Sequence, residues 1–436
     1  MKARLLPLLL LALPALAFPQ YKPWYNYYNF AYGAKALAMG NAFTAVADDL
    51  TATFWNPAGL AALRDPELYL SYKVSAQKHD YDLQSKAQPA DTRLYTYNFR
   101  SRLNQVDFFS VSAPFRLWKR PFTFALSYYR YIPYGFKGSA SEVLSFLNDR
   151  LHPSNTTVTF AGSEGLDVLA FSAAAALTDH FALGVTMQQF FGSGSLHVAE
   201  KNPLGEFHSQ ATERIQGRNM IAGLIFSPFK AFRLGMAWHS GLKTDLASDL
   251  LTWEVNRKGS VLHQLEYSRQ ALLELPQQLA AGALLKPARW LDLGAEYSVL
   301  DWQKATVMNY FGGGETLPYP QKDDWPLGQK RARNLRFGME ARLPLRTWLL
   351  HFRGGWSLDR ELYADETDHA VKVTGTAAGL GCDMSDYLTL EIAFQRQRSD
   401  WPEEGFVPHN PPVATHYRAD VFFLSLTYRF GHIFKE

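Results

Sequence analysis

The chain has 436 residues, a formal net charge of +3 and 47% hydrophobic residues, which excludes wholesale disorder and argues against a dedicated nucleic-acid-binding protein. A mean hydropathy of −0.20 argues against a bundle of membrane-spanning helices. Aromatic residues make up 14% of the chain. High aromatic content with low mean hydropathy is typical of a membrane β-barrel, whose lumen-facing half is polar. The single cysteine, Cys382, excludes a disulfide framework.

The N-terminus has the features of an export signal. Lys2 and Arg4 form a basic start, and residues 5–16 are an apolar stretch too short to span a bilayer. The sequence Ala-Leu-Ala before Phe18 fits the small-residue rule for cleavage. We therefore predict a signal peptide at 1–17 and a protein that leaves the cytoplasm.

A segment rich in small residues, 18–65, precedes the first expected strand. Between residues 31 and 62 the only formal charges are those of Lys35, Asp48 and Asp49, so this stretch is poorly suited to contact with water. Interruption by glycine and proline favours a compact insert whose backbone runs close to a surrounding wall. We expect the two aspartates to cap or hydrogen-bond the local backbone, with cation binding as the alternative.

Large apolar side chains in this segment need burial. Phe43, Phe54 and Trp55 would each gain about 1.5–3 kcal/mol from leaving water. Asn56 precedes Pro57, which biases it away from the helical region, and its side chain can hold a turn by binding nearby backbone groups. We expect this turn to lie inside the barrel, with Phe54 and Trp55 against the wall or a bound apolar ligand.

The rest of the chain, 66–436, shows the period-2 alternation of β-strands. In 291–299, for example, apolar residues at odd positions alternate with small or polar residues at even positions, and 232–239, 335–343 and 388–397 repeat the pattern. The expected strands are 67–77, 104–113, 121–132, 165–177, 180–191, 213–226, 231–240, 276–286, 290–300, 332–343, 347–358, 371–383, 387–398 and 418–430.

Connection lengths alternate strictly between short and long. Tight links are expected at 114–120, 178–179, 227–230, 287–289, 344–346 and 384–386, and long loops at 78–103, 133–164, 192–212, 241–275, 301–331, 359–370 and 399–417. Short turns on one side and long loops on the other are the pattern of an outer-membrane barrel. We predict an all-β fold, a transmembrane antiparallel barrel of about 14 strands. Helical spacing suggests a short loop helix at 140–151, and Gly192-Ser-Gly-Ser is expected to start a loop.

Charged residues recur on the polar face of two neighbouring expected strands. Arg336, Glu340 and Arg342 share one face of the first strand, and Arg353 follows on the second. A hairpin through 344–346 would bring Glu340 near Arg353. We therefore predict an ion-pair ladder inside the barrel.

Residues 31–64 carry a resemblance to a known family. The matching features are Gly33, Ala34, Met39-Gly40, Ala42-Phe43, Ala45, Ala47-Asp48-Asp49 and Asn56-Pro57-Ala58-Gly59. This run resembles the N-terminal signature of the FadL/TodX outer-membrane transport family, and related PorV-type barrels share it. More loosely, Leu275-Pro276 leading to Gly282, followed by Leu293 to Trp302, resembles a late strand pair of that family. The resemblance implies a fourteen-strand barrel whose N-terminal segment plugs the lumen as a hatch.

The resemblance also implies a function and a set of site residues. Expected hatch or gate residues are Gly33, Gly40, Asp48, Asp49, Asn56, Pro57, Ala58 and Gly59, and candidate ligand contacts are Phe43, Phe54 and Trp55. The implied activity is passive, cofactor-free uptake of fatty acids or hydrocarbons across the outer membrane of a Gram-negative cell. We expect a monomer that contacts outer-membrane lipid and lipopolysaccharide.

Other functions remain as alternatives. A PorV-like role would make the barrel a scaffold or shuttle for secreted proteins. An enzyme is not expected, because the sequence has no Gly-x-Ser-x-Gly, His-Glu-x-x-His or phosphate-loop motif. His239-Ser240 is the nearest approach to a hydrolase pair, and no catalytic or metal-binding residue is predicted. The acidic run Asp359, Glu361, Asp365 and Asp368 is expected to be a solvated loop, with Ca²⁺ or lipopolysaccharide bridging as the alternative.

Overall fold

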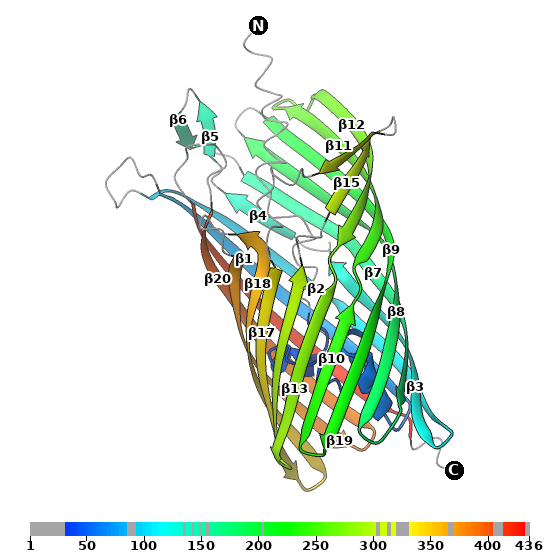
Figure 1. Cartoon of the computed structure of the whole chain (residues 1–436). Coiled ribbons are helices and arrows are strands. Elements are labelled where there is room, and N and C mark those ends of the chain that lie inside the picture. The colour runs from blue at the N-terminus through cyan, green and yellow to red at the C-terminus, as the bar shows by residue number, and fades with distance from the viewer. Residues whose placement is uncertain are drawn as a thin grey trace.

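The computed structural model describes residues 31–84, 93–133, 137–141, 144–147, 150–153, 157–202, 205–301, 306–311, 315–319, 331–364, 370–403 and 413–431. The expected signal peptide at 1–17 lies outside the described residues. Nineteen of the described strands form one antiparallel sheet, in which β1 (Glu67–Gln84) pairs with β21 (Val413–Arg429). This pairing of first and last strands closes the sheet into a barrel (Figure 1).

The wall strands follow one another around the barrel in chain order. Those between β1 and β21 are β2 (Arg93–Leu117), β3 (Arg120–Pro133), β4 (Lys137–Ser141), β7 (Thr157–Ala176), β8 (Phe181–Asn202), β9 (Gly205–Phe229), β10 (Phe232–His239), β11 (Leu242–Asn256), β12 (Val261–Leu275), β13 (Gln278–Ala288), β14 (Leu291–Asp301), β15 (Thr306–Phe311), β16 (Glu315–Tyr319), β17 (Arg331–Leu345), β18 (Trp348–Ala364), β19 (Ala370–Ser385) and β20 (Leu388–Glu403). Five wall strands are interrupted once, giving β3/β4, β10/β11, β12/β13, β14/β15 and β16/β17. The barrel therefore has 14 wall strands, and the predicted all-β barrel is confirmed.

Side chains of the wall alternate between the lumen and the outer surface. On β14, Leu293 and Tyr297 are 39% and 44% exposed on the outside, whereas Asp292 and Glu296 are buried on the inside. The same alternation runs through β10, β17 and β20. The predicted facing of all four strands is confirmed. An apolar outer face with a polar inner face suits a wall that borders lipid. No helix in the described part of the chain has the length and apolarity needed to cross a bilayer.

Strands extend into all seven of the expected long loops, and two of these loops are strands almost throughout their described residues. Residues 192–212 continue β8 and β9, where Asn202 pairs with Gly205, and residues 241–275 contain the β11–β12 hairpin. The run that begins at Gly192 therefore lies inside β8. The outer face is polar in these upper parts, so the sequence there lacks the apolar alternation of a lipid-facing strand. The backbone pairing nevertheless continues.

The expected helix at 140–151 is also wrong. The described residues there belong to β4 and to a separate two-stranded hairpin of β5 (Leu144–Leu147) and β6 (Arg150–Pro153). Periodicity alone does not separate a helix from a strand over so short an apolar run.

Asp359 does not lie in a solvated acidic loop. It belongs to β18, is buried on the lumen side, and its carboxylate lies 2.9 Å from a guanidinium nitrogen of Arg336. The side chains of Glu361, Asp365 and Asp368 lie outside the described residues.

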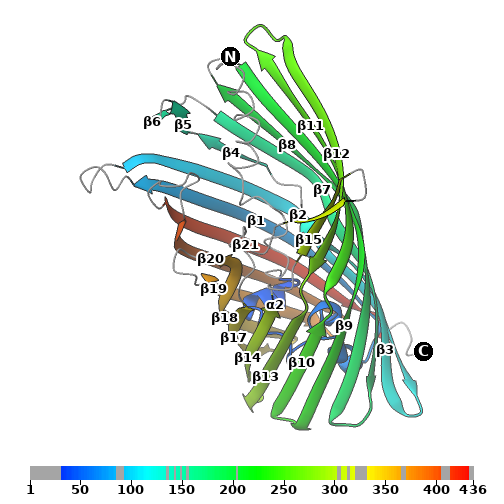
Figure 2. The same ribbon diagram turned by 45° about the horizontal axis from the view of Figure 1, so that its top comes forward.

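One side of the barrel is much taller than the other. β8 has 22 residues and β9 has 25, and with β11 and β12 they form the high wall seen in Figure 2. At about 3.3 Å per residue, β9 spans on the order of 80 Å along its length, against roughly 30 Å for the hydrocarbon core of a bilayer. The upper part of this wall therefore extends beyond the lipid-facing band.

Candidate functional site

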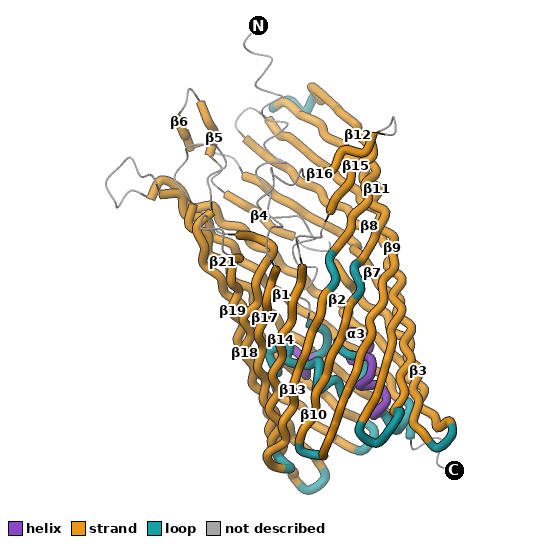
Figure 3. Tube along the Cα trace, viewed as in Figure 1, coloured by secondary structure: helices purple, strands orange, loops and turns teal. Residues whose placement is uncertain are grey.

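Residues 31–63 lie inside the barrel, enclosed by the wall (Figures 1 and 3). They contain α2 (Ala34–Ala38), α3 (Ala52–Trp55) and the 3-10 helix η3 (Pro57–Ala62). Every residue in this stretch is buried except Lys35, Asp48, Asp49 and Ala62. Apart from Ala62, the accessible residues are the three charged ones, as expected for an insert that fills a lumen. We call residues 31–63 the inner segment.

A belt of lumen-facing glycines receives the backbone of the inner segment. These glycines are Gly184, Gly223, Gly235, Gly282, Gly294, Gly338, Gly355 and Gly379, and we call them the glycine groove. Gly338 and Gly355 lie directly opposite each other on β17 and β18, against Met39 and Gly40. A Cβ on Gly355 would lie 2.6 Å from the Cα of Gly40, which is closer than carbon atoms can pack. The wall therefore needs glycine here, because backbone approaches backbone.

Asn56 ties a turn of the inner segment to the wall. Its Nδ2 donates to the carbonyl of Thr44 at 2.7 Å and to that of Leu224 on β9 at 3.1 Å, and its Oδ1 accepts from Ala58 N at 3.2 Å. The φ and ψ of Asn56 are −163° and 98°, an extended conformation that suits a residue before proline. Pro57 and Ala58 lie against Gly184. The turn lies inside the barrel against the wall, at the position expected from the sequence.

Aromatic rings pack one side of the inner segment. Phe54 meets Tyr32 edge-on at 4.6 Å and Trp55 at 5.3 Å between ring centroids, and Trp55 meets Phe43 at 6.2 Å. The indole N–H of Trp55 donates to the carbonyl of Tyr32 at 3.2 Å. The three candidate ligand contacts, Phe43, Phe54 and Trp55, are at most 7% exposed. We call these rings, with Tyr129 of β3 at 4.9 Å from Tyr32, the aromatic floor.

An ion-pair ladder lines the opposite wall. Glu340 and Arg353 are directly opposite each other on β17 and β18, and Arg353 Nε donates to Glu340 at 2.6 Å. Arg342 lies 2.7 Å from Glu340, and Arg353 lies 2.8 Å from Glu391 on β20. The predicted ion pairing inside the barrel is confirmed, and it spans three strands.

The inner segment joins this ladder through Lys35. Its ammonium lies 2.8 Å from Asp48 and 3.5 Å from Glu340. Burial inside the barrel acts to raise the pKa of Asp48. The neighbouring ammonium of Lys35 has the larger net effect and holds this pKa below its usual value. Burial, with Glu391 nearby, raises the pKa of Asp49 to about 7, and Asp49 accepts from Thr51 N at 2.8 Å. The two aspartates have separate protein partners, which fits hydrogen bonding and ion pairing rather than a shared cation.

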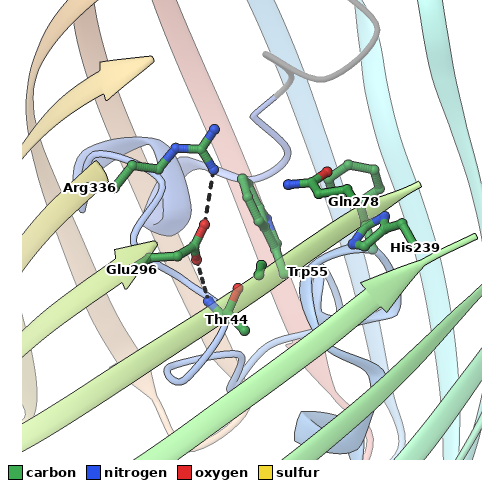
Figure 4. Close-up of a pocket in the computed structure, with 8 residues that line it drawn as sticks. Thr44, Trp55, His239, Gln278, Glu296 and Arg336 are labelled. Carbon is green, nitrogen blue, oxygen red and sulfur yellow. Dashed lines mark hydrogen bonds and ion pairs between the residues drawn. The ribbon is translucent and has the colours of Figure 1, made fainter. Parts of the chain in front are cut away.

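Glu296 fixes a second point of the inner segment. One carboxylate oxygen accepts from the backbone N–H groups of Phe43 at 3.0 Å and Thr44 at 2.9 Å, and the other accepts from Arg336 at 3.0 Å (Figure 4). Arg336 also donates to Asp359 at 3.0 Å. A buried carboxylate that binds two N–H groups and a guanidinium is a strong anchor.

Three expected hatch glycines occupy close contacts. Gly33 and Gly40 have φ values of 86° and 62°, which favour glycine, and Gly33 lies beside Thr51. Gly59 lies against the carbonyl of Ala47, so a side chain there would collide with the segment's own backbone. These glycines let the inner segment fold back on itself and onto the wall.

His239 and Ser240 do not form a hydrolase pair. His239 is buried on the lumen side, with its ring 5.4 Å from that of Phe54, whereas the Ser240 hydroxyl accepts from Met220 N at 2.8 Å. His239 lines a small cavity with Trp55 and Gln278, with room for about one water molecule (Figure 4).

The tall wall presents several apolar side chains to the lumen above the inner segment. Leu196, Ala211 and Leu250 are directly opposite one another on β8, β9 and β11, so they share a face, on which Glu213, Ser248 and Thr244 also lie. Ile215 and Leu242 continue this face downward and are 2% and 1% exposed. We call the five apolar residues the inner apolar face. It descends toward the aromatic floor.

Sequence comparison identifies the family. A model of the BamG family matches residues 28–334, which cover most of the wall and all of the inner segment. The chain belongs to the BamG family. No curated protein has a matching sequence.

Solved structures share the fold of this BamG-family barrel. A FadL homologue from Pseudomonas aeruginosa aligns at a TM-score of 0.64 with 15% identity, over 91% of this chain and 98% of that chain. The toluene transporter TodX of Pseudomonas putida aligns at 0.63 with 13% identity, over 92% and 99%. The toluene transporter TbuX of Ralstonia pickettii aligns at 0.55 with 15% identity, over 92% and 98%.

Sequence reasoning missed two features of the BamG-family barrel. Glu296 anchors the segment although 253 residues separate it from Phe43. The glycine groove was also missed, although isolated glycines in a strand pattern indicate close approach of another backbone.

Proposed function

We propose that this BamG-family barrel is an outer-membrane channel for passive uptake of hydrophobic small molecules, either fatty acids or hydrocarbons. The observation that carries this proposal is the inner apolar face, which leads down the lumen to the aromatic floor. The fold shared with two toluene transporters is consistent with the proposal. Apolar surface inside a lumen is costly to leave in water, at about 25 cal/mol per Å², so it favours an apolar ligand.

In the proposed mechanism, residues 18–65 act as the hatch. A ligand binds first to the inner apolar face and then reaches the rings of Phe54 and Trp55. Movement of the turn at Asn56–Gly59, beside the small cavity, lets the ligand pass. The hatch moves between its anchors at Glu296 and Lys35. The ligand moves down its gradient, so the proposal involves no cofactor, and no enzymatic step.

Neighbouring leucines of one strand provide a matched test. Leu250 lies on the inner apolar face, whereas Leu251 lies on the opposite face of β11, and both are partly buried. We expect Leu250→Glu to reduce uptake of a labelled long-chain fatty acid or of toluene into cells that lack their own transporter. Leu251→Glu should leave uptake unchanged. Equal uptake by both variants at equal barrel levels would contradict the proposal, and the preferred solute would separate the two substrate classes.

A PorV-like scaffold or shuttle for secreted proteins is the second candidate. Two observations favour it. The glycine groove holds the inner segment by backbone contact, as suits a permanent plug, and the β11–β12 hairpin tip exposes Val261, Leu262 and Leu265 at 50–57%. Secreted proteins that co-purify with the wild type and are lost with Leu262→Asp would favour this candidate. A hydrophobic molecule retained in the purified barrel would favour uptake.

A further inference from the structure

Four neighbouring lumen-facing side chains carry polar atoms that have no hydrogen-bond partner among the described residues. These atoms are Ser298 Oγ on β14, Asn334 Nδ2 on β17, Ser357 Oγ on β18 and Gln395 Nε2 on β20. Each of the four residues is at most 1% exposed. Nearly all buried polar groups in folded proteins are hydrogen-bonded, so such atoms gathered on one wall indicate a ligand or ordered water. We call these four residues the polar patch.

The polar patch is continuous across adjacent strands. Ser298 and Asn334 are directly opposite each other on β14 and β17. Asn334 and Ser357 are diagonal neighbours on β17 and β18, about 7–8 Å apart. A Cβ on Gly375 of β19 would lie 2.4 Å from Ser357 Oγ and 3.1 Å from Gln395 Nε2. Because glycine has no side chain, these two polar atoms meet over bare backbone, and one small chemical group can contact both.

The polar patch mainly offers hydrogen-bond donors. Asn334 Oδ1 accepts from Arg360 N at 2.9 Å, which fixes the orientation of the amide and leaves Nδ2 as the unused donor. Gln395 Oε1 accepts from Gln397 Nε2 at 3.2 Å, so its own Nε2 is the unused donor of that amide. The two serine hydroxyls can donate or accept. This set of groups suits an oxygen acceptor, such as a hydroxyl or carbonyl oxygen.

Neighbouring carboxylates disfavour a negatively charged ligand group at the polar patch. Glu296 is two residues from Ser298 on β14, and Asp359 is two residues from Ser357 on β18. Both acids are buried and pair with the guanidinium of Arg336, at 3.0 and 2.9 Å. One guanidinium offsets only part of the charge of two carboxylates. A third carboxylate would be repelled, strongly so in an enclosed site, whereas an uncharged oxygen would not.

The small cavity connects the polar patch to the aromatic floor. Phe54 and Trp55 line the cavity on the floor side, and Glu296 and Arg336 line it on the side of the patch (Figure 4). Arg336 is directly opposite Ser357 on β17 and β18. When the hatch moves as proposed, an apolar chain that lies on the floor can therefore place an oxygen-bearing end at the patch.

We propose that the polar patch is a second subsite of the lumen, which binds the uncharged oxygen-bearing end of an apolar solute, such as an alcohol or an ester. The inference rests on the proposed uptake function and narrows its solute class. A hydrocarbon leaves the donors of the patch unpaired, and a carboxylate is repelled by Glu296 and Asp359. Ligand sites are mostly apolar, with a few placed polar groups that fix the orientation of the ligand.

Three solutes of equal chain length test the subsite in the wild-type protein. Binding of octane, 1-octanol and octanoate to the purified full-length barrel is measured by isothermal titration calorimetry at a pH where octanoate is ionised. We expect 1-octanol to bind roughly tenfold more tightly than octane, the effect of about one net hydrogen bond, and more tightly than octanoate.

The outcomes separate the two proposals. If none of the three solutes binds, the uptake function is wrong and the inference fails with it. Equal binding of octane and 1-octanol would overturn the inference alone and assign the polar patch to ordered water. Tighter binding of octanoate than of 1-octanol would overturn the preference for an uncharged end.

A double variant locates the preference at the polar patch. Ser357→Ala/Gln395→Met removes two polar groups with little change in volume, so we expect the preference for 1-octanol to disappear while octane binds as it does to the wild type. Thr123→Val is the matched control, because Thr123 of β3 also has a buried hydroxyl without a partner among the described residues. The control should keep the preference. A preference that persists in a folded double variant would overturn the proposal, and the wild-type comparison tests it without any variant.

Discussion

Replacing Gly355 by valine should push the inner segment off the wall without opening the barrel. A Cβ at this position overlaps Met39 and lies 2.6 Å from the Cα of Gly40. Carbon atoms normally stay about 3.5 Å apart, so the contact has to open by roughly 1 Å. Overpacking of this kind costs about 1–3 kcal/mol. The wall is closed by its own backbone hydrogen bonds, so the strain falls on the inner segment.

Gly354 supplies the matched control. It is the neighbouring residue on β18 but faces outward, where a Cβ would have Met339 Cγ as its nearest neighbour, at 3.8 Å. Folding would be checked by heat-dependent migration in detergent gels, and the segment by single-channel conductance in planar bilayers. We expect Gly355→Val to fold and to conduct more than the wild type, while Gly354→Val matches the wild type. Unchanged conductance of a folded Gly355→Val barrel would refute the reasoning.

Three further changes probe the ladder, the wall and the turn. Glu340→Gln should cost about 3–5 kcal/mol of unfolding free energy in denaturant because it leaves buried cations unpaired, whereas Glu274→Gln, in a partly exposed pair with Lys243, should cost under about 1 kcal/mol. Leu293→Arg should destabilise the barrel in lipid vesicles by about 2–4 kcal/mol if it lies near the bilayer midplane, and a loss below 1 kcal/mol would reverse the assigned facing. Asn56→Ala removes three hydrogen bonds and should speed proteolysis at the inner segment with the wall intact, an effect that exposed Gln216→Ala should lack.

The lower half of each wall strand was predictable because two signals agree there. Lipid on one side and a polar lumen on the other impose strict alternation, and tight turns such as Trp118-Lys119 limit where a strand ends. The upper halves were missed because polar residues occupy the outer face, as at Glu206 and Gln210 of β9. Backbone pairing continues without the apolar signal that sequence reasoning follows.

The inner segment was partly predictable for a similar reason. Few charges and three large apolar side chains already required burial, and Asn-Pro indicated a turn held by a side chain. Its wall partners were not predictable from local sequence. Glu296 differs in no visible way from other lumen-facing acids, and its role depends on which residues meet across the closed barrel.

The glycine groove also has a consequence for the order in which the chain assembles. The groove spans strands from β8 to β19, and the inner segment touches most of them by backbone contact. A barrel that closed first would have to thread this segment through its own end. We therefore expect the sheet to curl around a segment that is already folded, and the β1–β21 seam to form last. On this view the inner segment acts during biogenesis as a template for the curvature of the wall.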